Sequence, residues 1–120
     1  MNDFVRAIKS GNVIAFPTET VYGLGADAWN FEAIQKVFET KGRPQDNPLI
    51  VHLSEVSQLE SFARDIPDAA YQLAEHYWPG PLTLILKRKT EVLDIITAGL
   101  DTVALRIPNH NVALNLLKET

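Results

Sequence analysis

Two cations, Lys41 and Arg43, stand at the start of the segment KGRPQDNPLIVHL, between an expected helix and an apolar strand. A guanidinium presents a planar fork to phosphate oxygens, and an ammonium adds a mobile point charge. Together these groups can hold a polyphosphate and offset charge that develops at a reacting phosphorus. Because Lys-x-Arg is a common spacing, the alternative is that Lys41 complements a helix C-terminus while Arg43 is solvated.

A pair of hydroxyls, Thr18 and Thr20, lies in the segment FPTETVYGLGADA, directly after another apolar strand. These hydroxyls suit the polar head of a small substrate, or else they bond the local backbone of a turn. Ligand sites in α/β sheets usually lie near strand ends, so the two segments are candidates for one site. Neither G-x-x-x-x-G-K-[ST] nor G-x-G-x-x-G is present, so a nucleotide would be bound in another way.

Three further polar residues lie on expected strands. Thr102 and Arg106 alternate with apolar residues, which places both on one non-core face of their strand. That face is either lined by a ligand or simply exposed, and a substrate carboxylate would be a natural partner for Arg106. His52 faces away from the apolar residues of its own strand. It is either a hydrogen-bonded structural residue or a donor or acceptor for a ligand.

Hydrophobic periodicity gives the elements that must position these residues. Helices are expected at Asp3–Ser10, from Asn30 to Gly42, at Glu55–Ala63, from Pro67 to Tyr77 and after Asn109 or Asn111; strands are expected at Val13–Phe16, Leu49–Leu53, Leu82–Leu86 and Thr102–Ile107. Glu91–Gly99 is ambiguous, a loop with a helical turn. Because no long helix separates the last two strands, the prediction is an α/β fold with an open, twisted, mixed β-sheet and flanking helices.

Composition narrows the class of protein. The chain has 120 residues, 46% hydrophobic and 22% charged, which fits one globular domain. A net charge of −4 disfavours a general nucleic-acid binder, although a local basic cleft is compatible with it. Cysteine is absent, and His and carboxylates are not at metal-ligand spacing, so no protein-bound metal is expected. Neither a signal peptide nor a membrane span is expected, which favours the cytoplasm.

Four segments together resemble one known family. FPTETVYGLGADA, KGRPQDNPLIVHL, WPGPLTLIL and TVALRIP occur here in the order and at the spacing seen in the YrdC-like family. The resemblance spans essentially the whole chain, and its first two motifs are highly specific together. The best-known members of the family are the threonylcarbamoyl-AMP synthases of tRNA modification.

The resemblance implies a nucleotidyltransferase reaction. L-threonine and bicarbonate give an N-carboxylated threonine, whose carboxylate attacks the α-phosphorus of ATP. Pyrophosphate leaves, and threonylcarbamoyl-adenylate remains. Mg²⁺ would accompany the ATP. A partner protein then transfers the threonylcarbamoyl group to an adenosine of tRNA, which becomes threonylcarbamoyladenosine.

The resemblance also implies roles for individual residues. Lys41 and Arg43 match the pair that holds the ATP phosphates and supports catalysis. Asn47 and Thr102 match further ATP contacts. Thr20, His52 and Arg106 match the positions that hold threonine. These roles agree with the independent prediction of a polar, non-core strand face.

In one respect the chain departs from the pattern. The family continues into a Ser-x-Asn motif that completes the ATP site, and residues 1–120 do not contain it. The expectation is an incomplete YrdC-like domain, truncated at the C-terminus and therefore inactive by itself. Missing sheet would leave an edge or an apolar patch that favours self-association.

Three rival functions remain at this point. The first is a non-catalytic YrdC-like module that binds nucleotide or double-stranded RNA, which a concave basic face would support. Lys41, Arg43, Lys87, Arg88 and Arg106 would have to form that face. The second is a carbamoyl-transfer relative used in metalloenzyme maturation, and the third is a paralogous group of unsettled function. The absence of Cys disfavours the second, and the intact KGR and NPLIVHL segments disfavour the third.

Overall fold

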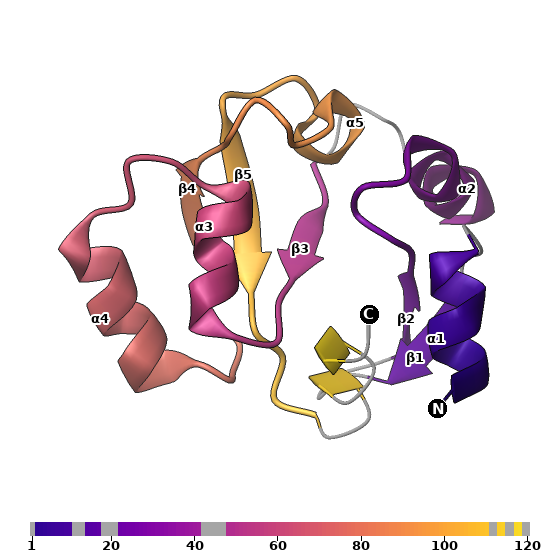
Figure 1. The fold of residues 1–120 in the computed structure, drawn as a ribbon, viewed down its shortest axis with the longest axis horizontal. Helices are drawn as coiled ribbons and strands as arrows, with labels where there is room; N and C mark the ends of the chain where they lie inside the picture. Colours follow the sequence, from indigo (N-terminus) through magenta and orange to yellow (C-terminus); the bar gives the residue numbers. More distant parts are fainter. Residues whose placement is uncertain are drawn as a thin grey trace.

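The structure is a computed structural model that describes residues 2–10, 14–17, 22–41, 48–110, 113–114 and 117–118 (Figure 1). Its elements are, in chain order, α1 (Asn2–Lys9), β1 (Ile14–Pro17), β2 (Tyr22–Gly25), α2 (Phe31–Lys41), β3 (Ile50–His52), the 3-10 turn η1 (Val56–Gln58), α3 (Leu59–Phe62), α4 (Asp68–Tyr77), β4 (Leu84–Lys87), α5 (Asp94–Thr97) and β5 (Thr102–Arg106). Among the described residues, no helix combines the length and apolar character needed to cross a bilayer.

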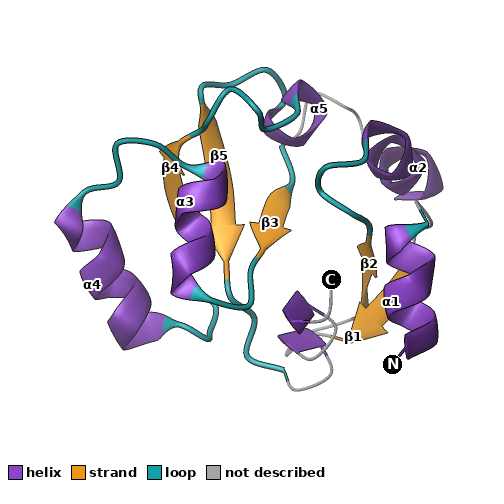
Figure 2. Ribbon diagram, viewed as in Figure 1, coloured by secondary structure: helices purple, strands orange, loops and turns teal. Residues whose placement is uncertain are grey.

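The strands form two sheets. β1 and β2 make an antiparallel pair, and β3, β5 and β4 make a three-stranded sheet with β5 in the middle. β3 runs parallel to β5, and β4 runs antiparallel to it. Figure 2 shows the β1–β2 pair beside α1 and the three-stranded sheet beside α3. The α/β class and the mixed sheet predicted from the sequence are therefore confirmed.

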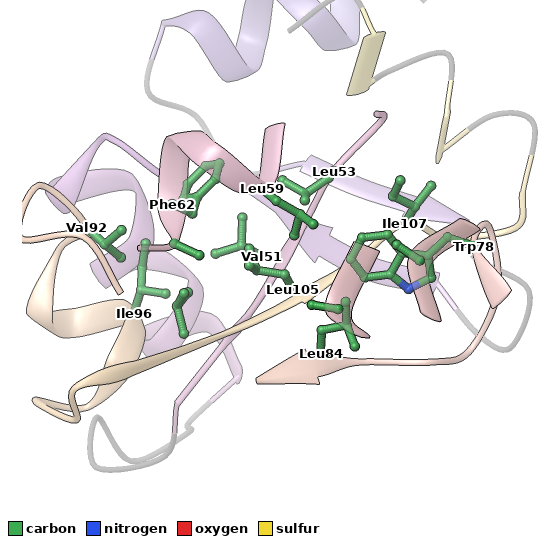
Figure 3. Packing of buried hydrophobic residues seen from close by; sticks show 14 of the residues in the cluster. Val51, Leu53, Leu59, Phe62, Trp78, Leu84, Val92, Ile96, Leu105 and Ile107 are labelled. Carbon is green, nitrogen blue, oxygen red and sulfur yellow. The ribbon is translucent and has the colours of Figure 1, made fainter. Parts of the chain in front are cut away.

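One face of the three-stranded sheet carries the main core. Val51 of β3, Leu84 of β4 and Leu105 of β5 pack with Leu59 and Phe62 of α3 (Figure 3). This follows from strand alternation, because every second residue points to the same face. Burying a side chain of this size stabilises the fold by about 1.5–3 kcal/mol. By the same alternation, the opposite face of the sheet carries the residues between them, such as His52, Ile85 and Arg106.

Helix α2 ends at Lys41 and is held by a cap at its start and by apolar residues on its buried side. The Asn30 side chain caps its first turn, since Oδ1 accepts the Ala33 N–H at 3.0 Å. Ile34 and Phe38, one turn apart, are 3% and 2% exposed and belong to the main core. Val37 is buried with them, whereas Phe31 at the start of the helix is 50% exposed.

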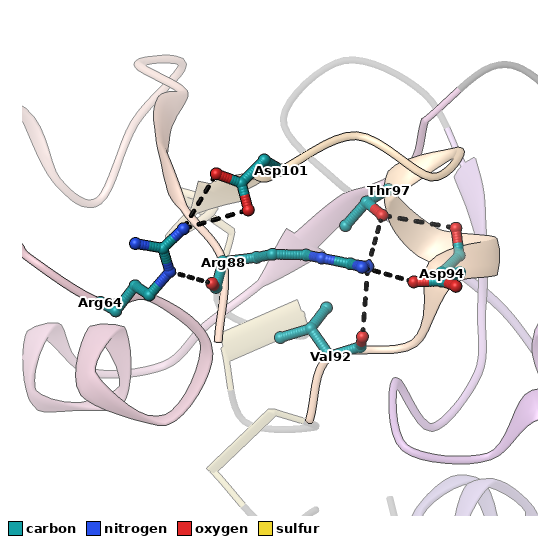
Figure 4. Close-up of polar contacts among 6 residues, drawn as sticks. All are labelled: Arg64, Arg88, Val92, Asp94, Thr97 and Asp101. Carbon is teal, nitrogen blue, oxygen red and sulfur yellow. Dashed lines mark hydrogen bonds and ion pairs between the residues drawn. The ribbon is translucent and has the colours of Figure 1, made fainter. Parts of the chain in front are cut away.

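The connection from β4 to β5 is held by two arginines (Figure 4). Arg88 donates to Thr97 Oγ1 at 2.8 Å and forms an ion pair with Asp94 at 2.5 Å, which ties the end of β4 to α5. Arg64 donates from Nε to the Arg88 carbonyl and from Nη2 to both carboxylate oxygens of Asp101. The ambiguous Glu91–Gly99 segment therefore contains the short helix α5 and has a defined shape.

Two sequence predictions need correction. Tyr22–Gly25, which is not among the strands expected from the sequence, is strand β2, because its backbone pairs with β1 in the register Ile14↔Gly25 to Pro17↔Tyr22. The strand expected at Leu82–Leu86 begins at Leu84 and extends to Lys87. Leu82 is held outside it, since its carbonyl accepts the indole N–H of Trp78 at 2.7 Å.

Candidate functional site

The candidate site is the face of the three-stranded sheet opposite the main core. On β5, Val103 and Leu105 are buried, whereas Thr102 and Arg106 alternate with them and are half-buried. On β3, His52 is the register partner of Arg106. Paired residues in a sheet project to the same side, so His52 and Arg106 stand next to one another on the non-core face. The predicted orientation of Thr102, His52 and Arg106 is therefore observed.

His52 occupies a largely desolvated position on this face. Burial lowers the pKa of its imidazole below the ordinary value of 6.5, because a cation is costly to hold away from water. The side chain is therefore neutral at pH 7, with one ring nitrogen that donates and one that accepts. A neutral imidazole suits the hydroxyl or amine of a small polar ligand.

Arg106 is anchored by the turn that follows α4. Its Nε–H donates to the carbonyl of Gly80 at 2.7 Å, and the Gly80 N–H donates to the carbonyl of Ile107 at 2.9 Å. Burial lowers the pKa of the guanidinium, which nevertheless stays charged at neutral pH. Sequence reasoning missed Gly80, since nothing in WPGP beyond its turn-forming residues indicates a contact with a strand 26 residues away.

Thr102 lies at the other end of β5. It is four steps along the strand from Arg106, a Cα distance of about 13 Å at ~3.3 Å per residue. Lys87 is its register partner on β4. The same end of the sheet adjoins α5, since the Leu49 N–H, just before β3, donates to the Ile96 carbonyl at 2.8 Å. One small ligand group cannot contact both Thr102 and Arg106, so any ligand on this face would meet them through different groups.

The remaining predicted residues lie largely outside the described part of the chain. Thr20, Arg43 and Asn47, together with the hydroxyl of Thr18, fall in undescribed segments. Lys41 is the last residue of α2, and only its backbone is described. Their expected convergence on the sheet face stays a prediction. The described chain resumes at Pro48, next to Leu49, which lies at the Thr102 end of the sheet.

Two other features of the described residues were considered as sites. A hollow of ≈ 590 Å³ lies on the outer side of α4, lined by Ala69, Gln72, Leu73, His76 and Tyr77. It is open and shallow and contains none of the predicted residues, so the sheet face remains the better candidate. Within the described residues, no group of three His, Asp or Glu side chains is placed to hold a metal ion.

The basic face that a nucleic-acid-binding module would need is only partly described, since the side chains of Lys41 and Arg43 lie outside the described residues. Lys87 is on the same sheet face as Thr102, by the alternation of β4. Arg88, the next residue, is instead engaged with Asp94 and Thr97. Of the five cations expected to form that face, Arg88 is therefore committed to holding α5.

A small mixed sheet with helices on its core side and a neutral His beside an anchored Arg on its other side defines an α/β protein with a candidate site on the non-core face. Comparison with known proteins then places it more closely. The family model described as Telomere recombination, for Sua5, YciO and YrdC proteins, matches residues 6–120. The chain belongs to this Sua5/YciO/YrdC family.

Relatives of known sequence and structure agree. The threonylcarbamoyl-AMP synthase of Pyrococcus abyssi is 54% identical over 92% of this chain, and that of Bacillus subtilis is 53% identical over 94%. The crystal structure of Pyrococcus abyssi Sua5 complexed with L-threonine matches with a TM-score of 0.93 at 52% identity, over 96% of this chain and 34% of that one. The chain spans 33% of the length of each of the two synthases.

Proposed function

We propose that this chain carries the threonine subsite and part of the ATP site of a threonylcarbamoyl-AMP synthase. In the proposed reaction, the threonine nitrogen bonds to the carbon of bicarbonate, a C–O bond breaks, and water leaves, which gives a carbamate. A carbamate oxygen attacks the α-phosphorus of ATP, the bond to the β-phosphate oxygen breaks, and pyrophosphate leaves with that oxygen. The product is threonylcarbamoyl-adenylate, a substrate for proteins that modify tRNA in the cytoplasm.

The observation that carries the proposal is the His52–Arg106 pair on the non-core face of the sheet. A guanidinium can pair with the carboxylate of threonine, and a neutral imidazole can bond to its hydroxyl or amine. The complex of L-threonine with the Pyrococcus abyssi relative, 52% identical to this chain, supports this assignment. Thr20 would complete the threonine subsite.

The Thr102 end of the sheet would face the nucleotide. Lys41, Arg43 and Asn47 belong to the segment that ends beside Leu49, and they would hold the phosphates there. Adenylation needs positioning and charge stabilisation more than it needs a nucleophilic side chain. Mg²⁺ would arrive with ATP as part of the substrate. No role in binding it is assigned to a described carboxylate.

The test is pyrophosphate release that requires both L-threonine and bicarbonate. It should be run on this chain and on a version extended by the part of the Pyrococcus abyssi relative that follows the matched region. We expect release from the extended version alone, because we propose that residues 1–120 are an incomplete YrdC-like domain. Equal release from both would contradict incompleteness, and no release from a folded extended version would contradict the function.

The phosphate role of the Lys-x-Arg pair has its own test. Arg43→Ala in the extended version should lower kcat/KM by at least about 10²-fold, the usual effect of removing one electrostatic stabiliser. The matched control is Lys118→Ala, because Lys118 is an exposed cation far from Arg43 in the sequence. This change should leave the rate unchanged. A rate that falls equally in both variants would show a loss of general charge rather than of a phosphate contact.

Sedimentation of this chain tests the expected self-association. Ile50 and Ile85, on the non-core face, are 47% and 68% exposed, which gives that face apolar side chains that can attract a second molecule. We expect oligomers that dissociate when Ile85 is changed to Lys. A monomer at high concentration would contradict self-association.

A further inference from the structure

We propose that Gly80 is a positioning residue for L-threonine, because its carbonyl fixes the guanidinium of Arg106. This rests on the proposed function for the identity of the ligand. The hydrogen bond between Arg106 Nε and Gly80 O is 2.7 Å long and half-buried, so it competes little with water. It joins the turn after α4 to the end of β5, two parts of the chain that are 26 residues apart.

The contact fixes the orientation of the guanidinium as well as its position. Arginine is planar, and a bond at Nε restricts rotation of that plane about the side chain. A carboxylate that pairs with this guanidinium at two points then uses the edge made by the two terminal nitrogens. Threonine would thus meet a preorganised fork, which reduces the entropy lost on binding.

The turn itself is built to hold the Gly80 carbonyl still. The Gly80 N–H donates to the Ile107 carbonyl at 2.9 Å, so Gly80 is tied to the end of β5 through both its N–H and its carbonyl. The indole N–H of Trp78 donates to the Leu82 carbonyl at 2.7 Å and closes the turn across Pro79 to Pro81. Trp78 is 8% exposed and belongs to the main core.

A side chain at position 80 would displace this carbonyl. A Cβ added to Gly80 would lie 2.6 Å from the backbone oxygen of Tyr77, a distance that forces the backbone to move. The glycine is therefore required by the close approach of the end of α4. Moving its carbonyl away from Nε should remove this one restraint on the Arg106 guanidinium without altering the charge of the site.

The experiment is an NMR titration with L-threonine of the extended version, which is the form expected to be active. The arginine Nε–H signals report the Gly80 contact, and the backbone signals give the dissociation constant. Gly80→Ala should raise the dissociation constant for L-threonine about tenfold, the scale of one hydrogen bond to a charged group. It should also speed solvent exchange of the Arg106 Nε–H. Trp78→Phe, which keeps the core aromatic ring, should act in the same direction if Gly80→Ala does not fold.

Two controls separate positioning from general damage. Gly99→Ala also adds a methyl at a glycine, and its φ of 77° makes that change strained, but it lies in the turn before β5 and should leave threonine affinity unchanged. In an Arg106→Lys background, which lacks Nε–H, Gly80→Ala should cause no further loss of affinity. Additive losses would indicate two independent effects and overturn the positioning role.

The outcomes distinguish this proposal from the proposed function. If the wild-type extended version binds L-threonine and folded Gly80→Ala and Trp78→Phe variants bind it equally well, Gly80 does not position the ligand. If the wild-type extended version does not bind L-threonine at millimolar concentration, the threonine subsite of the proposed function is wrong, and the positioning role is overturned with it.

Discussion

His52 and Arg106 are register partners in the parallel pairing of β3 and β5, and both leave the sheet on its non-core face. Each is half-buried, and burial lowers the pKa of both. The guanidinium remains charged at any pH where the fold is stable, whereas the imidazole can change its protonation state. His52 therefore makes this face sensitive to pH.

Stability should fall as the solution is acidified below about pH 6.5. The unfolded chain takes up a proton at His52 near the ordinary pKa of 6.5, while the folded chain resists it because the folded pKa is lower. Between these two values the unfolded state binds more protons, so the free energy of unfolding rises with pH. Urea midpoints measured from pH 5 to 8 should show this slope.

His52→Gln should flatten that part of the pH profile. His76→Gln is the control, since His76 lies on the exposed side of α4, and the slope should persist in it. If the slope survives in His52→Gln and disappears in His76→Gln, His52 is not the source of the acid sensitivity.

Leu105→Ala should be strongly destabilising. Leu105 is 0% exposed at the centre of β5, so its truncation leaves a cavity among Val51, Leu84 and Phe62. The expected loss is about 2–5 kcal/mol of unfolding free energy. Ile85→Ala, a comparable truncation on the opposite face at 68% exposure, should change stability by less than about 0.5 kcal/mol. Similar losses of unfolding free energy in Leu105→Ala and Ile85→Ala would contradict a core that lies on one face of the sheet only.

Arg88→Met should destabilise the α5 region by about 1–3 kcal/mol. Thr97 is 1% exposed, and its hydroxyl oxygen accepts a hydrogen bond from the Arg88 guanidinium. The substitution therefore leaves the buried Thr97 hydroxyl without this donor. Lys87→Met removes a neighbouring exposed cation and should have little effect. Chemical denaturation measures both. In the double variant Arg88→Met with Thr97→Val the loss should be smaller than the sum of the single losses, because both changes remove one contact.

Asn30→Ala should cost about 1 kcal/mol of stability through the loss of the α2 cap. The effect should appear as faster amide hydrogen exchange in the first turn of the helix. Lys36→Ala, an exposed change in the middle of α2, should leave exchange there unaltered. Equal protection in wild type and Asn30→Ala would mean that the side-chain cap contributes nothing to the helix.

Strict alternation made the faces of β3 and β5 predictable from the sequence. Val103 and Leu105 could only be buried together, and that placed Thr102 and Arg106 on the other side. β2 was missed because Gly23 and Gly25 are typical of a turn, whereas here a neighbouring strand supplies the pairing.

Contacts between distant segments were beyond sequence reasoning. The Arg106–Gly80 bond depends on how the turn after α4 meets the end of β5, and no local pattern encodes that. The start of β4 was misplaced for a similar reason, since Leu82 is as apolar as the strand but its carbonyl serves Trp78. Arg88 was considered as part of a basic face, yet α5 supplies its partners.

The parallel partnership of β3 and β5 also sets a time order for a newly made chain. His52 and Arg106 are separated by about half of the 120 residues, and at roughly 5–20 residues per second the ribosome needs about 3–10 s to add the intervening part. During that interval β3 has been synthesised but its neighbour has not, so Val51 and Leu53 have no strand to shield them. The pairing of β3 with β5 must therefore form late, after most of the described chain has been synthesised.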